Sequence, residues 1–295
     1  MNNLSIFKLN DLTPNDIENL LDLADCFKKE KEKRDFSKKI SCNLFFENST
    51  RTNYSFQVAQ HRLGMKVISF NPKTSSIQKL ESFYDTVKTF DSFNPDLLIM
   101  RCSENEFWKK FEGKIKTPII NAGDGSGNHP TQSLLDLFTI RQEFSRLKGL
   151  TVGIIGDISH SRVAHSNAEI MKRLGMKVIV SGPPEYMDPD LEYVKFPEIL
   201  TFCDVIIMLR MQHERHNVKC SITEEEYNKL YGINKESVKK LKLKSIIMHP
   251  GPVNRGVEIL DEFIECEKSR IFNQVENGVF VRMALIDYVV SKQGI

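Results

Sequence analysis

Residues 150–181, LTVGIIGDISHSRVAHSNAEIMKRLGMKVIVS, contain a complete strand–helix–strand pattern. Leu150–Gly156 is a short apolar run typical of a buried strand, and Val178–Ser181 is a second one rich in β-branched residues. Between them, Ala164–Leu174 has its apolar residues at helical spacing. A strand, a helix and a second strand in this order are typical of two parallel neighbours joined by a crossover. The stretch therefore predicts an α/β fold with a parallel sheet.

The same alternation extends along the chain in both directions. Further strands are expected at Ile40–Phe46, Val67–Phe70, Leu97–Met100, Pro118–Asn121, Val205–Met208 and Ser245–Met248. Further helices are expected at Pro14–Lys33, Thr52–Leu63, Leu80–Phe90, Glu106–Glu112, Thr131–Leu147, Pro197–Phe202, Thr223–Leu230 and Gly278–Lys292. The pattern predicts two doubly wound domains, each with a parallel sheet of about four strands.

The long amphipathic stretch after residue 130 separates the two halves of the chain. We expect a first domain formed by residues 1–132 together with a C-terminal helix, 278–295, that returns to it. Residues 133–147 form the expected connecting helix and residues 148–277 the second domain. In such folds, ligands bind beyond the carboxyl ends of the strands. The loops that follow strands are therefore where we expect the functional residues.

Composition and charge exclude several classes of protein. Of 295 residues, 41 are Lys or Arg and 39 are Asp or Glu, a formal net charge of +2 that argues against a general nucleic-acid binder. The six cysteines form no C-x-x-C pair, and HERH (213–216) lacks the spacing of the HExxH zinc motif. No basic and then apolar leader, and no apolar run of about 20 residues, is evident. We expect a cytoplasmic protein that binds no metal, nucleic acid or membrane.

One loop has the chemistry of an anion site. The strand that ends near Phe46 is followed by ENSTRT, in which Ser49, Thr50 and Thr52 supply hydroxyls and backbone N–H groups at a helix start. Arg51 adds a planar, permanently charged fork suited to phosphate. The loop lacks the GxxxxGK[ST] pattern of a nucleotide P-loop. An ordinary Ser/Thr N-cap beside a surface arginine remains an alternative.

Seven segments, in order, resemble the aspartate/ornithine carbamoyltransferase family. They are FFENSTRT (45–52, signature F-x-[EK]-x-S-[GT]-R-T), SSIQK (75–79), IMR (99–101), NAGDGSGNHPTQSLLDLFTI (121–140), IIGDISHSRVAHS (154–166), LRMQHER (209–215) and IMHPGPVNRGVEI (247–259). Within the family, the chain most resembles the catalytic chains of the aspartate branch. The resemblance implies transfer of the carbamoyl group of carbamoyl phosphate to the amine of L-aspartate, in pyrimidine biosynthesis, without a cofactor.

The resemblance also implies a carbamoyl phosphate site. Its residues are Ser49, Thr50, Arg51, Thr52, Ser75, Arg101, His129, Gln132, Gly251 and Pro252. In the family, the arginine at 101 holds phosphate and the carbonyl oxygen, the histidine at 129 contacts the carbamoyl oxygen, and the glutamine at 132 contacts the nitrogen. The residues at 251 and 252 offer backbone carbonyls to the NH2 group. Taken without the motifs, the favoured interpretation of Arg101 is an arginine at the sheet edge, and that of His129 is a structural histidine.

The expected aspartate site comprises Lys79, Arg162, Arg210 and Gln212. Two arginine forks suit two carboxylates, because bidentate pairing fixes orientation as well as charge. In the family, the loop that carries Ser75 and Lys79 reaches the active site of a neighbouring subunit, which implies a homotrimer with shared sites. The expected catalytic residues are Arg51, Thr52, Lys79, Arg101 and His129, with Thr52, Arg101 and His129 stabilising an oxyanion.

Three other functions compete with this interpretation. An ornithine carbamoyltransferase typically has HCLP where this chain has HPGP (249–252). A dehydrogenase is suggested by the strand–turn–helix at Gly153 and Gly156, but the pattern is not GxGxxG and no acidic ribose partner is clear. A non-catalytic relative would be expected to lack catalytic residues. Leu80, Cys102 and Gly251 depart from the commonest family pattern without removing a catalytic side chain.

Overall fold

The structure, a computed structural model, describes residues 4–211 and 222–292. The chain divides into two compact units: unit 1 is formed by residues 1–138 and 275–295, and unit 2 by residues 139–274. The divisions fall within two helices, α4 (Pro130–Phe144) and α10 (Ile271–Ser291), so each of these helices contributes residues to both units. Each unit is described by itself below.

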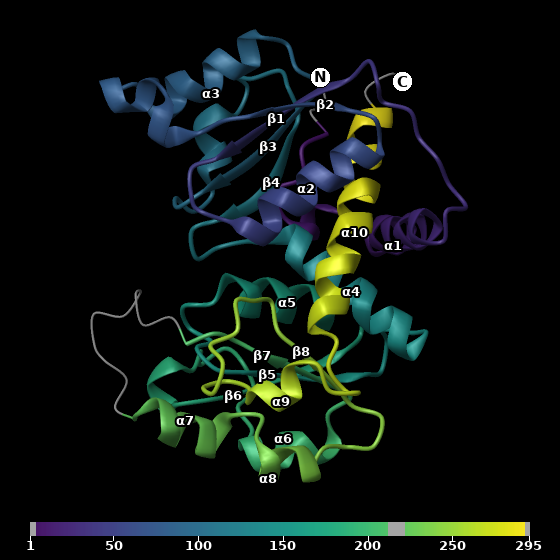
Figure 1. The fold of residues 1–295 in the computed structure, drawn as a ribbon, viewed down its shortest axis with the longest axis vertical. Helices are drawn as coiled ribbons and strands as arrows, with labels where there is room; N and C mark the ends of the chain where they lie inside the picture. The colour runs from purple at the N-terminus through teal and green to yellow at the C-terminus, as the bar shows by residue number, and fades with distance from the viewer. Residues whose placement is uncertain (1–3, 212–221, 293–295) are drawn as a thin grey trace. The chain divides into compact units, whose positions relative to one another are not determined.

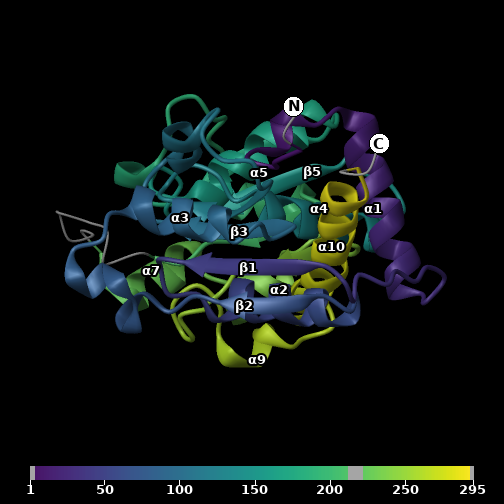
Figure 2. The ribbon, with the colours of Figure 1, turned by 90° about the horizontal axis from the view of Figure 1, so that it is seen from above.

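Unit 1 contains a four-stranded parallel sheet, and the strands lie in the order β2-β1-β3-β4 (Figure 1). Figure 2 shows β2, β1 and β3 in this order. The strands are β1 (Ile40–Phe45), β2 (Lys66–Ser69), β3 (Leu97–Cys102) and β4 (Ile119–Asp124). The other helices of this unit are α1 (Pro14–Lys28), α2 (Thr50–Arg62) and α3 (Phe83–Ser92). Short 3-10 turns are η1 (Leu9–Asp11), η2 (Pro72–Thr74), η3 (Ser76–Lys79) and η4 (Phe107–Phe111).

Both faces of this sheet are covered, as a parallel sheet requires. On one face, Cys42 and Leu44 of β1 belong to an apolar cluster with Val87 of α3 and residues of η4. On the other face, Asn43 Oδ1 and Ser41 Oγ each accept a hydrogen bond from Gln60 Nε2 of α2, both at 2.7 Å. The alternation along β1 therefore attaches α2 to the sheet and sets where its first turn lies.

Helix α1 begins as predicted and ends earlier than predicted. Thr13 is its N-cap and accepts a hydrogen bond from Asp16 N at 3.1 Å, with Pro14 at the first position. The helix ends at Lys28, and Glu30 has a left-handed φ of 54°, so the expected extension to Lys33 is wrong. The charged run that follows leaves the helix, and Arg34 Nε pairs with Asp287 of α10 at 3.0 Å.

Unit 2 repeats the architecture with strand order β6-β5-β7-β8, again all parallel (Figure 1). The strands are β5 (Thr151–Ile155), β6 (Lys177–Ser181), β7 (Val205–Met208) and β8 (Ile246–Met248). The helices are α5 (Arg162–Arg173), α6 (Phe196–Phe202), α7 (Glu224–Tyr231), α8 (Lys235–Lys239) and α9 (Asp261–Ile264), with one 3-10 turn, η5 (Pro184–Tyr186). The prediction of two α/β halves with four parallel strands each is confirmed.

The two sheets share one topological property that locates their sites. In each unit the chain passes from the first strand to a neighbour on one side and then crosses to the other side. The order therefore reverses between β1 and β3 in unit 1 and between β5 and β7 in unit 2. Open parallel sheets bind ligands outside the carboxyl ends of the strands at such a reversal.

No helix within residues 4–211 and 222–292 combines the length and the apolar character needed to cross a membrane.

Candidate active site

The first turn of α2 follows β1 and presents the ENSTRT loop. Ser49 occupies the N-cap position, but its hydroxyl accepts no hydrogen bond from the helix. The serine and threonine N-caps of α1, α3, α5 and α7 all accept such a bond from the third residue of their own helix. Arg51 is exposed in this turn and Thr52 is buried. The turn is therefore not an ordinary serine cap, and its hydroxyls and N–H groups have the arrangement of an anion site.

Arg101 lies at the carboxyl end of β3, in parallel register with Phe45 of β1. Its side chain is only 13% exposed, so it is not a surface arginine at the sheet edge. The guanidinium Nε lies 3.3 Å from Glu47 Oε2, and Nη1 donates a weak hydrogen bond of 3.5 Å to the carbonyl of Ala122. Arg101 thus stands between the ends of β1 and β4, where the strand order reverses and α2 begins.

The segment between β4 and α4 is shaped by the buried carboxylate of Asp124. Its Oδ1 accepts hydrogen bonds from Asn121 Nδ2 at 2.8 Å and Asn128 N at 2.9 Å. Gly125 has a φ of 33°, and a Cβ at this position would lie 2.8 Å from the Ser103 carbonyl oxygen. Glycine is therefore required in this turn. Asp124 was not among the residues expected from the sequence, although its place at the end of a buried strand, inside NAGDG, was a signal.

This segment positions His129 and Gln132 at the start of α4. His129 is buried, and its carbonyl accepts hydrogen bonds from Gln132 N at 3.0 Å and Ser133 N at 3.1 Å. The Gln132 side chain donates to Asp136 Oδ1 at 3.0 Å, one helical turn later. The HPTQ motif therefore lies at the carboxyl end of β4, next to the strand that carries Arg101.

Ser75 and Lys79 lie in the 3-10 turns after the edge strand β2. Ser75 Oγ donates to the carbonyl of Pro72 at 3.0 Å, and Lys79 is exposed. Within the described residues, no hydrogen bond or ion pair joins either side chain to Arg101. Leu80 has a left-handed φ of 66° and is 95% exposed. A leucine in this conformation costs on the order of 1 kcal/mol, so a glycine would fit the backbone better.

In unit 2, Arg162 is the first residue of α5, directly after the loop that follows β5. Its side chain is buried, and the preceding Ser161 caps the helix by accepting a hydrogen bond from Ala164 N at 3.2 Å. An arginine at this position lies at the reversal point of the second sheet, as Arg51 does near that of the first.

The same loop contains a serine, a histidine and an aspartate that do not form a nucleophilic triad. His160 Nδ1 lies 2.8 Å from Asp157 Oδ1 and 3.0 Å from Ser159 Oγ. A triad requires the acid and the nucleophile to contact different ring nitrogens. Here both contact Nδ1, so the trio orders the loop rather than activating the serine.

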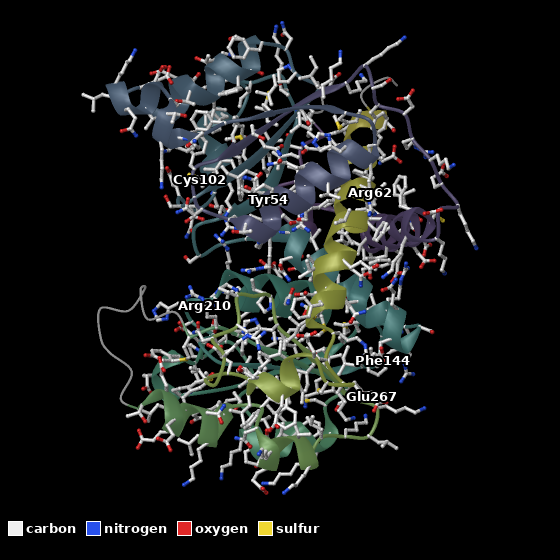
Figure 3. The ribbon with its side chains drawn as sticks, in the orientation of Figure 1. Tyr54, Arg62, Cys102, Phe144, Arg210 and Glu267 are labelled. Carbon is white, nitrogen blue, oxygen red and sulfur yellow. The ribbon has the colours of Figure 1, made fainter. Side chains whose placement is uncertain are left out.

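Arg210 follows β7, and its side chain is labelled in Figure 3. The next residue, Met211, donates its N–H to Glu258 Oε1 at 2.8 Å. Glu258 also accepts hydrogen bonds from Asn254, through the backbone N at 2.7 Å and through Nδ2 at 2.9 Å. This buried carboxylate therefore joins the loop after β7 to the loop after β8. Burial raises the pKa of Glu258 to about 7, against the lowering effect of these hydrogen bonds.

Gly251 and Pro252 lie in the loop after β8. Gly251 has a φ of 68°, which accounts for a glycine where the family often has a larger residue. Its N–H donates to His249 Nδ1 at 2.8 Å. Gln212 and residues 213–216 lie outside the described residues. In the described ranges, no three His, Cys, Asp or Glu side chains form a group that could hold a metal ion.

The pKa of Glu258 leads to a testable dependence of stability on pH. Because the folded pKa lies above the unfolded value, the folded chain binds the proton more tightly, and its stability falls as pH rises from about 4.5 to about 7. The contribution is on the order of 3 kcal/mol across this interval. Urea unfolding between pH 5 and 8 should show a shallower pH slope for Glu258→Gln than for the unsubstituted chain.

The matched control is Glu236→Gln, because Glu236 lies in the same unit at an exposed position on α8. It should leave the pH slope between 5 and 7 unchanged. An unchanged slope in Glu258→Gln as well would contradict the assignment.

Comparisons with known proteins agree along the whole chain. Residues 5–142 match the carbamoyl-P binding domain of aspartate/ornithine carbamoyltransferases, and residues 190–289 match their Asp/Orn binding domain. The chain is 44% identical over 290 residues to the aspartate carbamoyltransferase catalytic subunit of Staphylococcus carnosus (strain TM300), covering 98% of this chain and 96% of that protein.

Solved structures show the same relationship. Aspartate transcarbamoylase from Trypanosoma cruzi in complex with N-(phosphonacetyl)-L-aspartic acid superposes with a TM-score of 0.89 at 30% identity, covering 97% of this chain and 95% of that one. A putative aspartate carbamoyltransferase from Leishmania major Friedlin superposes with a TM-score of 0.84 at 29% identity, covering 97% and 96%. With both of its halves matched, the chain belongs to the aspartate/ornithine carbamoyltransferase family.

Proposed function

We propose that this chain transfers the carbamoyl group of carbamoyl phosphate to the α-amine of L-aspartate, giving N-carbamoyl-L-aspartate and phosphate, a step of pyrimidine biosynthesis. The observation that carries the proposal is the uncapped first turn of α2 beside Arg101, at the reversal point of the unit 1 sheet. Support comes from the identity with the Staphylococcus carnosus enzyme. The Trypanosoma cruzi enzyme has been crystallised with carbamoyl phosphate and aspartate.

Unit 1 is proposed to bind carbamoyl phosphate. The phosphate dianion accepts hydrogen bonds from the N–H groups and hydroxyls of Ser49 to Thr52 and from the forks of Arg51 and Arg101. His129 and Gln132 contact the carbamoyl oxygen and nitrogen. Ser75 contributes to the phosphate end. From unit 2, the family resemblance adds the carbonyls of residues 251 and 252, which would accept from the carbamoyl NH2.

Unit 2 is proposed to bind aspartate through Arg162 and Arg210, each paired with one carboxylate. Lys79 and Gln212 complete this set. Ornithine has one carboxylate and a cationic side chain, so it would leave one arginine fork unmatched and add a repelling charge. The HPGP segment, 249–252, also lacks the cysteine typical of ornithine enzymes. Aspartate is therefore the favoured acceptor.

The charges of the two substrates match those of the proposed site. Phosphate carries about −1.5 to −2 near neutral pH, and aspartate with a neutral amine adds two carboxylates, for a total near −4. The five proposed cations are Arg51, Lys79, Arg101, Arg162 and Arg210. The balance requires no metal ion.

The mechanism follows from this arrangement. The neutral α-amine attacks the carbonyl carbon, and the new C–N bond produces a tetrahedral intermediate with a negative oxygen. Thr52, Arg101 and His129 donate hydrogen bonds to this oxygen, a type of stabilisation that is often the largest catalytic contribution. The C–O bond to phosphate then breaks, and the departing phosphate takes the amine proton. No covalent intermediate with the protein forms, and holding the two substrates in place supplies the remaining rate.

We propose a homotrimer with shared sites, and the exposed apolar residues of unit 1 support it. The edge strand β2 is exposed and includes Ile68, and α2 exposes Tyr54 (Figure 3) and Val58. Leu80 adds an exposed apolar side chain in the loop of Ser75 and Lys79. These features suit a subunit contact. Lys79 makes no contact with Arg101 in its own chain, as expected if it serves the neighbouring site.

The cytoplasm is the proposed compartment. The five described cysteines are all free, which fits a reducing environment.

Removing either phosphate-binding arginine tests the proposed function. We expect Arg51→Ala and Arg101→Ala each to lose more than about a hundredfold in turnover, because each removes a charge that contacts the reacting phosphoryl or carbonyl group. Carbamoyl aspartate formation measures the loss, and circular dichroism checks that the chain stays folded. Arg62→Ala, at the exposed far end of the same helix, should retain full activity. Near-normal activity in both site variants would exclude the assignment.

Mixing two inactive chains tests the shared site. When Arg51→Ala and Lys79→Ala chains are dissociated, mixed in equal amounts and reassembled, about a quarter of the sites should combine an intact Arg51 with an intact Lys79 from a neighbour. Activity should therefore rise far above that of either parent. Mixed oligomers that form, as shown by mass spectrometry, yet stay as inactive as the parents would refute sharing.

A further inference from the structure

Arg282 is a buried cation in unit 1, on the last helix of the chain. Its side chain is 3% exposed, and its guanidinium centre lies 5.0 Å from the centroid of the Phe56 ring. Nη1 donates to the carbonyl of Gly278 at 2.9 Å, and Nη2 donates to Thr131 Oγ1 at 3.3 Å. All three partners are uncharged. Among residues 4–211 and 222–292, no carboxylate forms an ion pair with this guanidinium.

In the part of the chain that the structure describes, the charge of Arg282 therefore has no counterion. Its Nε is buried and has no hydrogen-bond partner in the described part of the chain. Burial, together with the like charge of Arg101, lowers the pKa of Arg282 to about 9, so it remains positively charged at neutral pH. A buried cation with no acidic partner costs stability, and an anion that binds nearby would offset that cost.

Two of the three partners of Arg282, Thr131 and Phe56, belong to segments of the proposed carbamoyl phosphate site, and the third, Gly278, lies on its own helix. Thr131 stands between His129 and Gln132 at the start of α4. Phe56 lies one helical turn after Thr52 on α2. Gly278 leaves room for the guanidinium, because a Cβ there would lie 2.5 Å from Nη1. Arg282 therefore contacts the first turn of α4 and the second turn of α2, the two helices whose starts are proposed to contact substrate.

We propose that Arg282 is a positioning residue for carbamoyl phosphate: its buried charge adds to that of Arg101 in attracting the phosphate group, and its hydrogen bond to Thr131 orients the turn that carries His129 and Gln132. The inference rests on the proposed function of unit 1. The phosphate dianion provides the countercharge for both arginines, and part of the binding free energy is the relief of their mutual repulsion.

The test measures inorganic phosphate binding by calorimetry, and thermal unfolding of the full chain with and without phosphate. Arg282→Met keeps most of the volume and removes the charge. We expect it to unfold at the same temperature as the unsubstituted chain, or higher, when phosphate is absent. Phosphate affinity should fall about tenfold or more, and the phosphate-induced rise in unfolding temperature should shrink accordingly. In steady-state assays, KM for carbamoyl phosphate should rise while KM for aspartate changes little.

Two further variants separate charge from contact. Arg282→Gln keeps a donor for Thr131 without the charge, and it should also bind phosphate weakly. Thr131→Val keeps the charge but not the hydrogen bond, so we expect near-normal phosphate affinity and a lower kcat. Arg62→Met is the matched control, because Arg62 packs on the Phe280 ring at 5.1 Å yet is exposed. It should change none of these quantities.

Normal phosphate affinity in Arg282→Met or Arg282→Gln would overturn the inference while leaving the function intact. Failure of both variants to fold would also overturn it, because it would show that the side chain is needed for stability without phosphate. No phosphate binding by the unsubstituted chain would count against the proposed function itself, and the inference would fall with it.

Discussion

The proposed site depends on one physical feature, the positive charge that the fold holds at the carboxyl ends of its parallel strands. Parallel strands place all their carboxyl ends at one edge, and the reversal between β1 and β3 brings the start of α2 beside Arg101. Glu47 offsets part of this charge beside Arg101, and within residues 4–211 and 222–292 no acid pairs with Arg282. We therefore propose that the site favours dianions, because each added negative charge offsets an existing electrostatic cost.

Unit 2 has the same strand topology, but its proposed substrate is aspartate. Its reversal point carries Arg162 after β5 and Arg210 after β7, two forks suited to two carboxylates. Glu258 ties the backbone next to Arg210 to the loop that carries Gly251. Buried carboxylates thus order loops in both units, Glu258 in unit 2 and Asp124 in unit 1. In the proposed mechanism, side chains that are already in position raise the rate by holding the two substrates together.

Much of this could be predicted from the sequence, because its strands are short apolar runs and its motifs lie in the loops that follow them. The start of α1 at Thr13 was predictable from local chemistry, whereas its end at Lys28 was not, since Lys and Glu are good helix formers. The missing capping hydrogen bond of Ser49 could not be predicted either, because a serine at an N-cap usually accepts one from its helix. The roles of Glu258 and Arg282 could not be predicted, because the burial of a charged side chain depends on packing partners that are far apart in the sequence.

The most direct measurement of the central claim is a competition between acceptors. Purified chain would be given 13C-labelled carbamoyl phosphate with equal concentrations of L-aspartate and L-ornithine, and the products would be followed by NMR. The account predicts carbamoyl aspartate and phosphate in equal amounts, with little or no carbamoyl ornithine. Carbamoyl ornithine as the main product, or no transfer to either amine by a folded oligomer, would contradict it.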